Sequence, residues 1–252
     1  MNTKIKVLSL ALVGLCGFAG SAMAACPAGP TTADGGAWTS KSVLPPSTST
    51  LAITTPGLDT TECALSASLG PSTTASAFVR YDHAASEPNY RFQFLVDTTS
   101  LSGFSATDNV VVFQAPSTTT ANGFNRLLRV SLVGGPSGSK RARFIAQCGT
   151  GTFTCAQTFA TDLIAGVNRI EGKLTVGAGA AGSLSYWVNA AAGTTEPAAS
   201  GTIANLDNAA WGGVSAATLG LTAPSAAFKT NHPTQVVKFD RFDSRRQTYI
   251  GS

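Results

Sequence analysis

Four residues in the second half of the chain have side chains suited to holding a sugar: Trp187, Trp211, Arg245 and Tyr249. Aromatic rings offer flat apolar contact surfaces, and an arginine donates several hydrogen bonds in a fixed plane. Trp187 alternates out of phase with its apolar neighbours, so it faces the other side of its strand. Trp211 lies in a loop-like segment, 208–213, where core packing explains a large aromatic less easily. We predict these four as ligand contacts. The alternative for each tryptophan is packing in the core or at its rim.

Carboxylates in the pattern of a glycosidase are missing from this chain. Many such enzymes built on β-sheets carry two acidic residues at alternate positions of one strand, so that both project onto the same face. The nearest spacing is that of Asp240 and Asp243, which a regular strand places on opposite faces. We therefore interpret both as partners of the neighbouring arginines.

Other catalytic patterns are equally weak. A lyase needs a tyrosine or histidine base beside a neutralising arginine, and only Tyr249 near Arg245 and Arg246 suggests that arrangement. The chain has no G-x-S-x-G turn for a serine nucleophile. His83 precedes a loop, where it either contacts a ligand or is solvated, and His232 falls in a turn. We predict no catalytic residue and no enzyme activity.

Export is the first property that the N-terminus predicts. Lys4 and Lys6 precede an apolar run, 7–20, that is too short to span a bilayer, and Ala22 and Ala24 occupy the small-residue positions of a signal peptidase site. Cleavage after Ala24 predicts a secreted or periplasmic protein. No second apolar run approaches the length of a transmembrane segment.

The composition excludes nucleic acid as a partner. About 228 residues remain after cleavage, enough for one large domain. Loss of two lysines lowers the formal charge from +4 to +2, and only 12% of the residues are charged. The closest approach to a basic cluster is Lys140, Arg141 and Arg143, which a strand would split between its two faces.

The mature chain keeps four cysteines, Cys26, Cys63, Cys148 and Cys155. An even number in an oxidising compartment predicts two disulfides. A short Gly/Thr segment separates Cys148 from Cys155, which favours a bridge across a hairpin and leaves Cys26 to pair with Cys63. The alternatives are buried free thiols, or a lipoprotein acylated at Cys26. A metal site is not expected, because no C-x-x-C pair is present and the two histidines are isolated.

Period-two alternation recurs from about residue 50 onward, and no segment shows sustained helical periodicity. The clearest strand is Tyr90–Asp97, with aromatic and aliphatic residues on one face and polar residues on the other. Glycine-rich turns at 134–138 and 177–182 predict antiparallel hairpins. About ten such strands without helices between them predict an all-β, antiparallel two-sheet sandwich. We predict strands at 62–68, 77–81, 90–97, 109–114, 126–133, 142–147, 168–176, 183–189, 217–221 and 236–242.

Several of these strands follow one another as a pattern: EPNYRFQF at 87–94, VVFQA at 111–115, GSLSYWVN at 182–189 and FDRFDSRRQTYIG at 239–251. In this order they resemble the laminin-G-like, concanavalin A-like jelly-roll domains of exported bacterial proteins. The resemblance covers residues 50–252, after a signal peptide at 1–24 and a lead-in segment at 25–49. It implies two curved sheets with one concave face.

That resemblance implies no single activity, because the fold hosts lectins, enzymes and adhesion modules. It keeps calcium open, since laminin-G-like domains often bind it through loop carboxylates, although no other cofactor is expected. We predict an exported, non-catalytic module that binds a glycan or another cell-surface component. Alternatives are a structural, self-assembling surface protein and a divergent polysaccharide-degrading enzyme. The oligomeric state is open.

Overall fold

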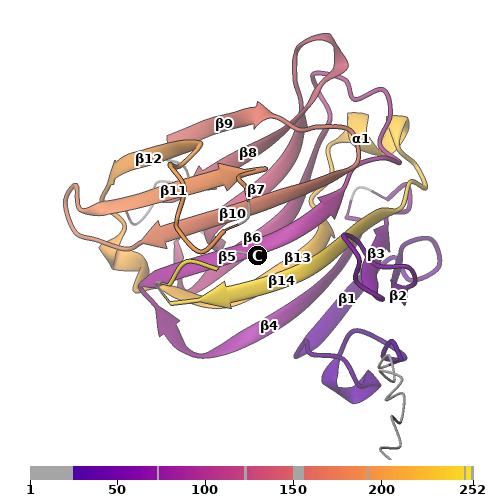
Figure 1. Cartoon of the computed structure of the whole chain (residues 1–252), viewed down its shortest axis with the longest axis horizontal. Helices are drawn as coiled ribbons and strands as arrows, with labels where there is room; N and C mark the ends of the chain where they lie inside the picture. Colours follow the sequence, from indigo (N-terminus) through magenta and orange to yellow (C-terminus); the bar gives the residue numbers. More distant parts are fainter. Residues whose placement is uncertain are drawn as a thin grey trace, which may run out of the picture.

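The computed structural model describes residues 25–72, 74–121, 124–149, 156–191, 193–246 and 248–250. The signal peptide expected at 1–24 lies outside these residues. Two seven-stranded antiparallel sheets lie face to face (Figure 1), in the orders β1-β4-β13-β6-β7-β8-β9 and β12-β11-β10-β5-β14-β3-β2. We call them the first sheet and the second sheet. The predicted all-β, two-sheet sandwich is therefore confirmed.

The first sheet consists of β1 (Ser40–Leu44), β4 (Ser76–Glu87), β13 (Val214–Thr222), β6 (Asn109–Ala121), β7 (Phe124–Gly134), β8 (Lys140–Ala146) and β9 (Ala156–Asp162). The second sheet consists of β12 (Gly201–Leu206), β11 (Gly182–Val188), β10 (Val167–Thr175), β5 (Asn89–Asp97), β14 (Val237–Arg245), β3 (Ala64–Ser68) and β2 (Thr50–Thr54). One α-helix, α1 (Ala226–Asn231), and three short 3-10 turns, η1 (Thr32–Asp34), η2 (Pro136–Gly138) and η3 (Ala209–Trp211), complete the described elements.

The core lies between the sheets and is rich in aromatic residues. Phe92 of β5 stacks on Phe113 of β6 with 4.2 Å between ring centroids, and Phe144 stacks on Tyr186 at 4.3 Å. Alternation along β5 produces this arrangement, because every second residue from Tyr90 points inward. The remaining residues of β5 therefore face away from the core, on the outer face of the second sheet.

Both predicted hairpins are confirmed, since β7 pairs with β8 and β10 with β11 in antiparallel register. The sequence patterns missed four strands, β1, β2, β9 and β12, as well as α1. β1 and β2 are short strands at the sheet edges, and β1 falls within the predicted lead-in segment. α1 is too short for helical periodicity; Ser225 caps it by accepting a hydrogen bond from the Phe228 amide.

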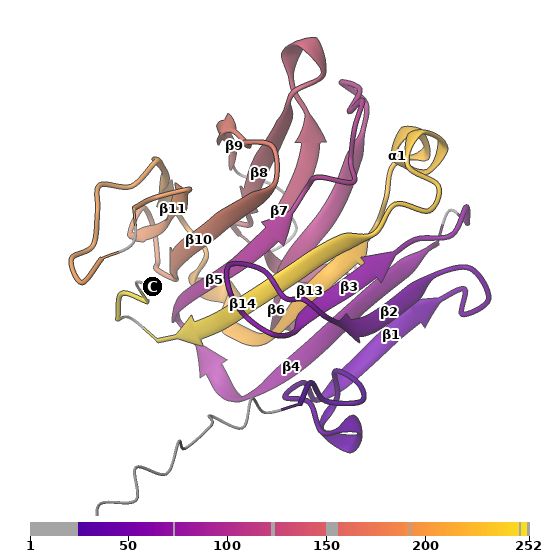
Figure 2. The same ribbon diagram turned by 45° about the vertical axis from the view of Figure 1, so that its right-hand side comes forward.

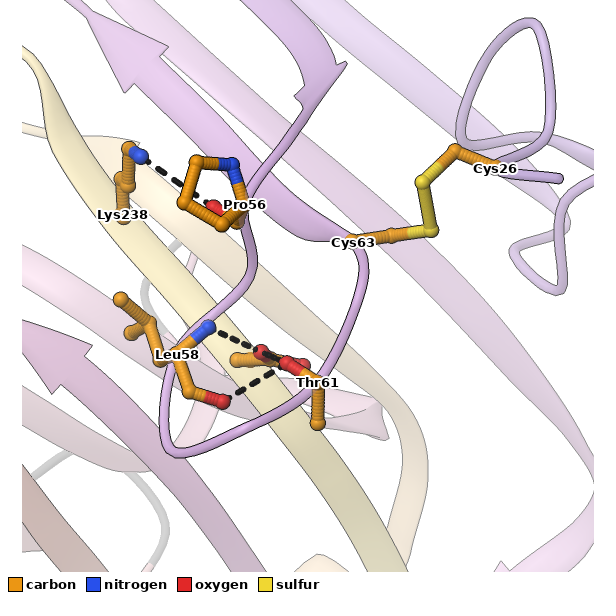
Figure 3. The surroundings of a disulfide bond; sticks show 7 residues. Cys26, Pro56, Leu58, Thr61, Cys63 and Lys238 are labelled. Atoms are coloured by element: carbon orange, nitrogen blue, oxygen red, sulfur yellow. Dashed lines mark hydrogen bonds between the residues drawn. A yellow bond between two sulfur atoms is a disulfide. The ribbon is translucent and has the colours of Figure 1, made fainter. Parts of the chain in front are cut away.

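One predicted disulfide is present, between Cys26 and Cys63, whose Cα atoms lie 5.7 Å apart. Figure 3 shows this bond joining the N-terminal segment to the chain that leads into β3. A sulfur in a disulfide cannot also carry a lipid, so the structure favours this use of Cys26. Cys148 is disulfide-bonded as well, while Cys155 lies outside the described residues. Within the described part of the chain, no helix has the length and apolarity needed to cross a membrane.

Candidate functional site

A cleft of about 660 Å³ opens at one end of the sandwich, between β4 of the first sheet and β14 of the second. Its walls also include Trp38 from the N-terminal segment and Tyr90 from the start of β5. Figure 2 shows β4 curving up to its turn into β5, with β14 beside it. β4 is 12 residues long, and the residues of its second half extend beyond the aromatic core. Side chains that would pack inward elsewhere line a cavity here.

His83 is the central ionisable group of the cleft. It projects from β4 two residues after Tyr81, and alternation places both side chains on the same face. Burial lowers the pKa of His83 from its ordinary value of 6.5, and the carboxylates of Glu87 and Asp82 offset part of that effect. The imidazole is therefore neutral at pH 7. With the residues that the structure describes it forms no hydrogen bond: Nε2 is buried without a partner, which leaves Nδ1 as the nitrogen open to a ligand.

Two tyrosines flank this histidine. The ring of Tyr90 lies 5.2 Å from the imidazole and that of Tyr81 lies 5.6 Å from it, measured between centroids. Tyr90 is 1% exposed, and burial raises its pKa far above the ordinary value of 10.0, with the nearby Ser244 hydroxyl offsetting little. Tyr81 is 43% exposed, so its hydroxyl is the one that a bound molecule can reach.

Arginines from the end of β14 stand at the rim of the cleft. Arg246 pairs with Glu87 at 2.9 Å, and its side chain is 77% exposed. Arg245 pairs with Asp243 at 2.8 Å, as the sequence suggested for that carboxylate. The guanidinium side of both ion pairs is exposed to water, so an incoming anion can compete for these groups.

Asp240 lines the cleft and fixes the position of the loop between β2 and β3 through hydrogen bonds. One of its carboxylate oxygens accepts hydrogen bonds from the amide of Leu58, at 2.7 Å, and from the Thr61 hydroxyl. Figure 3 shows this loop crossing β14 close to the disulfide. The other oxygen accepts from the Arg241 amide, at 2.7 Å, where β14 bulges and Arg241 adopts a φ of 46°. Asp240 is thus a structural residue of the cleft.

Three of the four predicted ligand contacts gather beside this cleft, around a buried arginine that the sequence patterns did not single out. Arg91 of β5 lies between the rings of Trp187, 4.5 Å from its centroid, and Tyr249, at 4.9 Å. Arg245 donates to the carbonyl of Tyr249, at 3.1 Å. Trp187 is 3% exposed and its indole donates to the Pro197 carbonyl. Of the four, Arg245 alone lines the cleft.

Trp211 lies elsewhere. It belongs to η3, is 2% exposed and packs in the main core, and its indole nitrogen donates to the carbonyl of Gly149 at 2.9 Å. The alternative reading of core packing therefore describes its position. His232, expected in a turn, caps α1 and is buried 3.4 Å from Asp108. Among the residues that the structure covers, no three His, Cys, Asp or Glu side chains are grouped to hold a metal, and calcium, which the resemblance left open, stays untested.

Signals for His83 and Tyr81 were present in the sequence. The strand predicted at 77–81 ends two residues before His83, whereas β4 continues to Glu87. Extending that strand places Tyr81 and His83 on one face. No sequence pattern, however, brings the end of β14 against β4, because these segments are more than 150 residues apart. The tertiary fold alone assembles the cleft.

Comparison with known proteins shows the fold. No family model and no curated sequence matches the chain. Solved structures that match include an endo-β-1,4-glucuronan lyase from Trichoderma reesei, with 11% identity, a TM-score of 0.62 and coverage of 89% of this chain and 95% of that one. An alginate lyase matches with 11% identity, a TM-score of 0.60 and coverage of 90% and 96%. An alginate lyase from Aplysia kurodai matches with 10% identity, a TM-score of 0.54 and coverage of 78% and 87%.

These matches correct two expectations. The prediction of a non-catalytic binding module is contradicted, because the three solved chains named above, which share this architecture over most of their length, are polysaccharide lyases. The matches favour the alternative of a divergent polysaccharide-degrading enzyme. They also contradict the prediction of no enzyme activity. The jelly-roll, concanavalin A-like class agrees with the matches, whereas nothing among them supports the laminin-G-like family. The sequence patterns gave this alternative little support, because the single base that they placed beside a neutralising arginine was Tyr249, near Arg245 and Arg246.

Proposed function

We propose that this protein is an exported lyase that cleaves a uronate-containing polysaccharide by β-elimination in the cleft between β4 and β14. The observation that carries the proposal is a neutral, unpaired His83 beside an accessible tyrosine, with arginines at the rim of the same cleft. β-Elimination needs these three kinds of group: a base, an acid, and a cation to neutralise the carboxylate of the sugar. The similarity to glucuronan and alginate lyases supports the reaction class.

His83 is the base in this proposal. Its Nδ1 takes the proton from the ring carbon that bears the carboxylate, and the freed electron pair forms a carbon–carbon double bond with the neighbouring carbon. Arg245 or Arg246 pairs with the carboxylate and stabilises the charge that develops there. The lowered pKa of His83 keeps its imidazole in the form that accepts a proton at neutral pH.

Tyr81 is the acid. The glycosidic carbon–oxygen bond breaks, its electron pair goes to the leaving oxygen, and the Tyr81 hydroxyl supplies the proton which that oxygen needs. The products are one chain with an unsaturated terminal sugar and one with a free hydroxyl group. Tyr90 is too buried to reach the substrate, so it acts on the orientation of His83.

The test is incubation with polyglucuronate, alginate and polygalacturonate while the ultraviolet absorbance of the new double bond is recorded. We expect His83→Ala and Tyr81→Phe each to lower kcat by about 100-fold or more. Tyr249→Phe is the matched control, because it removes a hydroxyl outside the cleft and should leave kcat unchanged. Absence of an unsaturated product from every polyuronate would overturn the proposal, and so would full activity in His83→Ala.

A further inference from the structure

The outer face of the first sheet carries a row of polar side chains, separate from the cleft. Strand pairing places Arg80, Thr218, Gln114, Arg129 and Ile145 directly beside one another across β4, β13, β6, β7 and β8. At about 4.8 Å between strands, this row is roughly 19 Å long. The residues next to each of them in sequence, such as Phe113 and Phe144, belong to the core, so the row faces away from it.

Arginines concentrate on the β7 and β8 part of this face. Arg143 lies opposite Ser131. This pair is two residues along the strands from the pair of Arg129 and Ile145, so both pairs are on the same face. Burial lowers the pKa of Arg129, and the charges of Arg126 and Arg143 add to this effect, in keeping with the strand register that places Arg129 and Arg143 on one face. Guanidinium groups stay protonated at neutral pH, so this is a positively charged patch.

The two central arginines of this patch have no anionic partner within the described part of the chain. The acidic residues nearby are already engaged, Asp162 with Arg141 at 2.9 Å and Asp82 with Arg80 at 2.7 Å. Arg129 and Arg143 form no ion pair with any residue that the structure describes, and the Nε of each is buried without a hydrogen bond. Arg143 makes one long contact, 3.3 Å to the amide oxygen of Asn109.

The side chains that lie beside these arginines on the same face are polar and are shielded from water. Gln114 and Thr218 are each 8% exposed and Ser131 is 1% exposed, although all three face outward, and the Ser131 hydroxyl has no partner. Buried donors without partners are costly, since each loses its hydrogen bond to water. A bound anion offsets that cost, because it accepts hydrogen bonds from several guanidinium groups at once.

We propose that this arginine face, defined by Arg129, Arg143, Gln114 and Ser131, binds the anionic groups of a polysaccharide without cleaving it. The row contains no histidine, tyrosine or lysine to act as a base, so it is a binding surface. Its length suits an extended chain with repeated charges better than a single small anion. Carboxylate and sulfate groups share the chemistry that it would recognise, and the inference goes beyond the proposed cleavage in the cleft.

Binding is measured by affinity electrophoresis and calorimetry with alginate oligosaccharides, dextran sulfate and neutral dextran as probes. We expect binding to a charged polymer, none to dextran, and a loss of about tenfold or more in Arg129→Gln/Arg143→Gln. The matched control is Arg169→Gln/Lys173→Gln, which removes two charges from β10 on the outer face of the second sheet. Circular dichroism checks folding, and the single substitutions replace the pair if it unfolds, each with a smaller loss in the same direction.

The His83→Ala variant separates this proposal from the one for the cleft. It should lose cleavage and bind the polymer with wild-type affinity. If wild type binds no anionic probe, or if the arginine and control variants bind equally, the proposal is overturned. An equal loss of affinity in His83→Ala would place binding in the cleft and overturn it too.

Discussion

At the scale of single residues, the environment of His83 decides its chemistry. A histidine at the end of a strand is ordinarily solvated and titrates near 6.5. Here two tyrosine rings and the curvature of β4 remove water from the imidazole, which disfavours its charged form. Two carboxylates, Glu87 and Asp82, act in the opposite direction but with a smaller effect. The result is an imidazole that is mainly uncharged at neutral pH, where the carboxylates of polyuronates are ionised.

The pKa of His83 can be measured directly. We expect NMR titration of its ring protons to give a value below 6.5, and Asp82→Asn to lower it further by removing a charge that favours the imidazolium. The folded protein then binds fewer protons than the unfolded chain, so this group's stabilising effect is present above pH 6.5 and is lost as the pH falls through the folded pKa. The acid limb of kcat/KM should follow the same value. A pKa above 6.5, or a rise in Asp82→Asn, contradicts this account.

At the scale of secondary-structure elements, Arg91 fastens the connection between β11 and β12 to the second sheet. Its Nε donates to Glu171 of β10 at 2.5 Å, and a terminal nitrogen donates to Glu196 of that connection at 2.7 Å. The Arg91 side chain is 0% exposed, and that of Glu171 is 4% exposed, so this ion pair is fully desolvated. Trp187 and Tyr249 pack on the guanidinium and keep water out.

The two glutamates should therefore differ in their effect on stability. Glu171→Gln leaves a buried cation short of its closest counter-charge, and we expect a loss of about 3 kcal/mol in the free energy of unfolding. Glu196→Gln removes a partner whose side chain is 38% exposed, and we expect about 1 kcal/mol or less. Urea denaturation of both variants measures the difference. Equal losses of stability in the two variants would show that the burial of Glu171 does not strengthen its ion pair with Arg91.

At the scale of the whole molecule, the Cys26–Cys63 disulfide links the N-terminal segment to the sandwich. This segment supplies Trp38, whose ring lies 4.9 Å from that of Phe242 and lines the cleft. Cys63 lines the same cleft and follows the loop that Asp240 holds. One covalent bond thus stabilises the fold and one wall of the cleft together.

Replacement of both cysteines tests that coupling. The bond closes a loop with a sequence separation of 37, for which chain entropy alone gives about 3 to 4 kcal/mol. We expect Cys26→Ser/Cys63→Ser to unfold at lower denaturant concentration and to cleave polyuronates with a raised KM. Wild-type protein treated with a reductant should show at least this shift, because the disulfide of Cys148 is reduced as well. An unchanged unfolding midpoint would mean that packing of Trp38 alone holds the segment.

The sequence by itself determined the strand pattern and the two glycine-rich hairpins, because alternation and turn chemistry are local properties. It also predicted the pairing of Cys26 with Cys63, because these two cysteines remain once Cys148 is assigned to Cys155. It also marked Arg245 and Tyr249, which lie together in the structure. Edge strands such as β1 and β2 are only 5 residues long, which is too short for alternation to single them out.

Only the tertiary structure decided which side chains meet. His83 and Arg246 come from β4 and from the end of β14, and they line one cleft because the two sheets bring those strands to the same end of the sandwich. Arg129 and Arg143 become neighbours because β7 and β8 pair in a register that sets Arg143 opposite Ser131 and Arg129 opposite Ile145. Local sequence fixes which face of a strand a residue occupies, whereas long-range pairing fixes its neighbours.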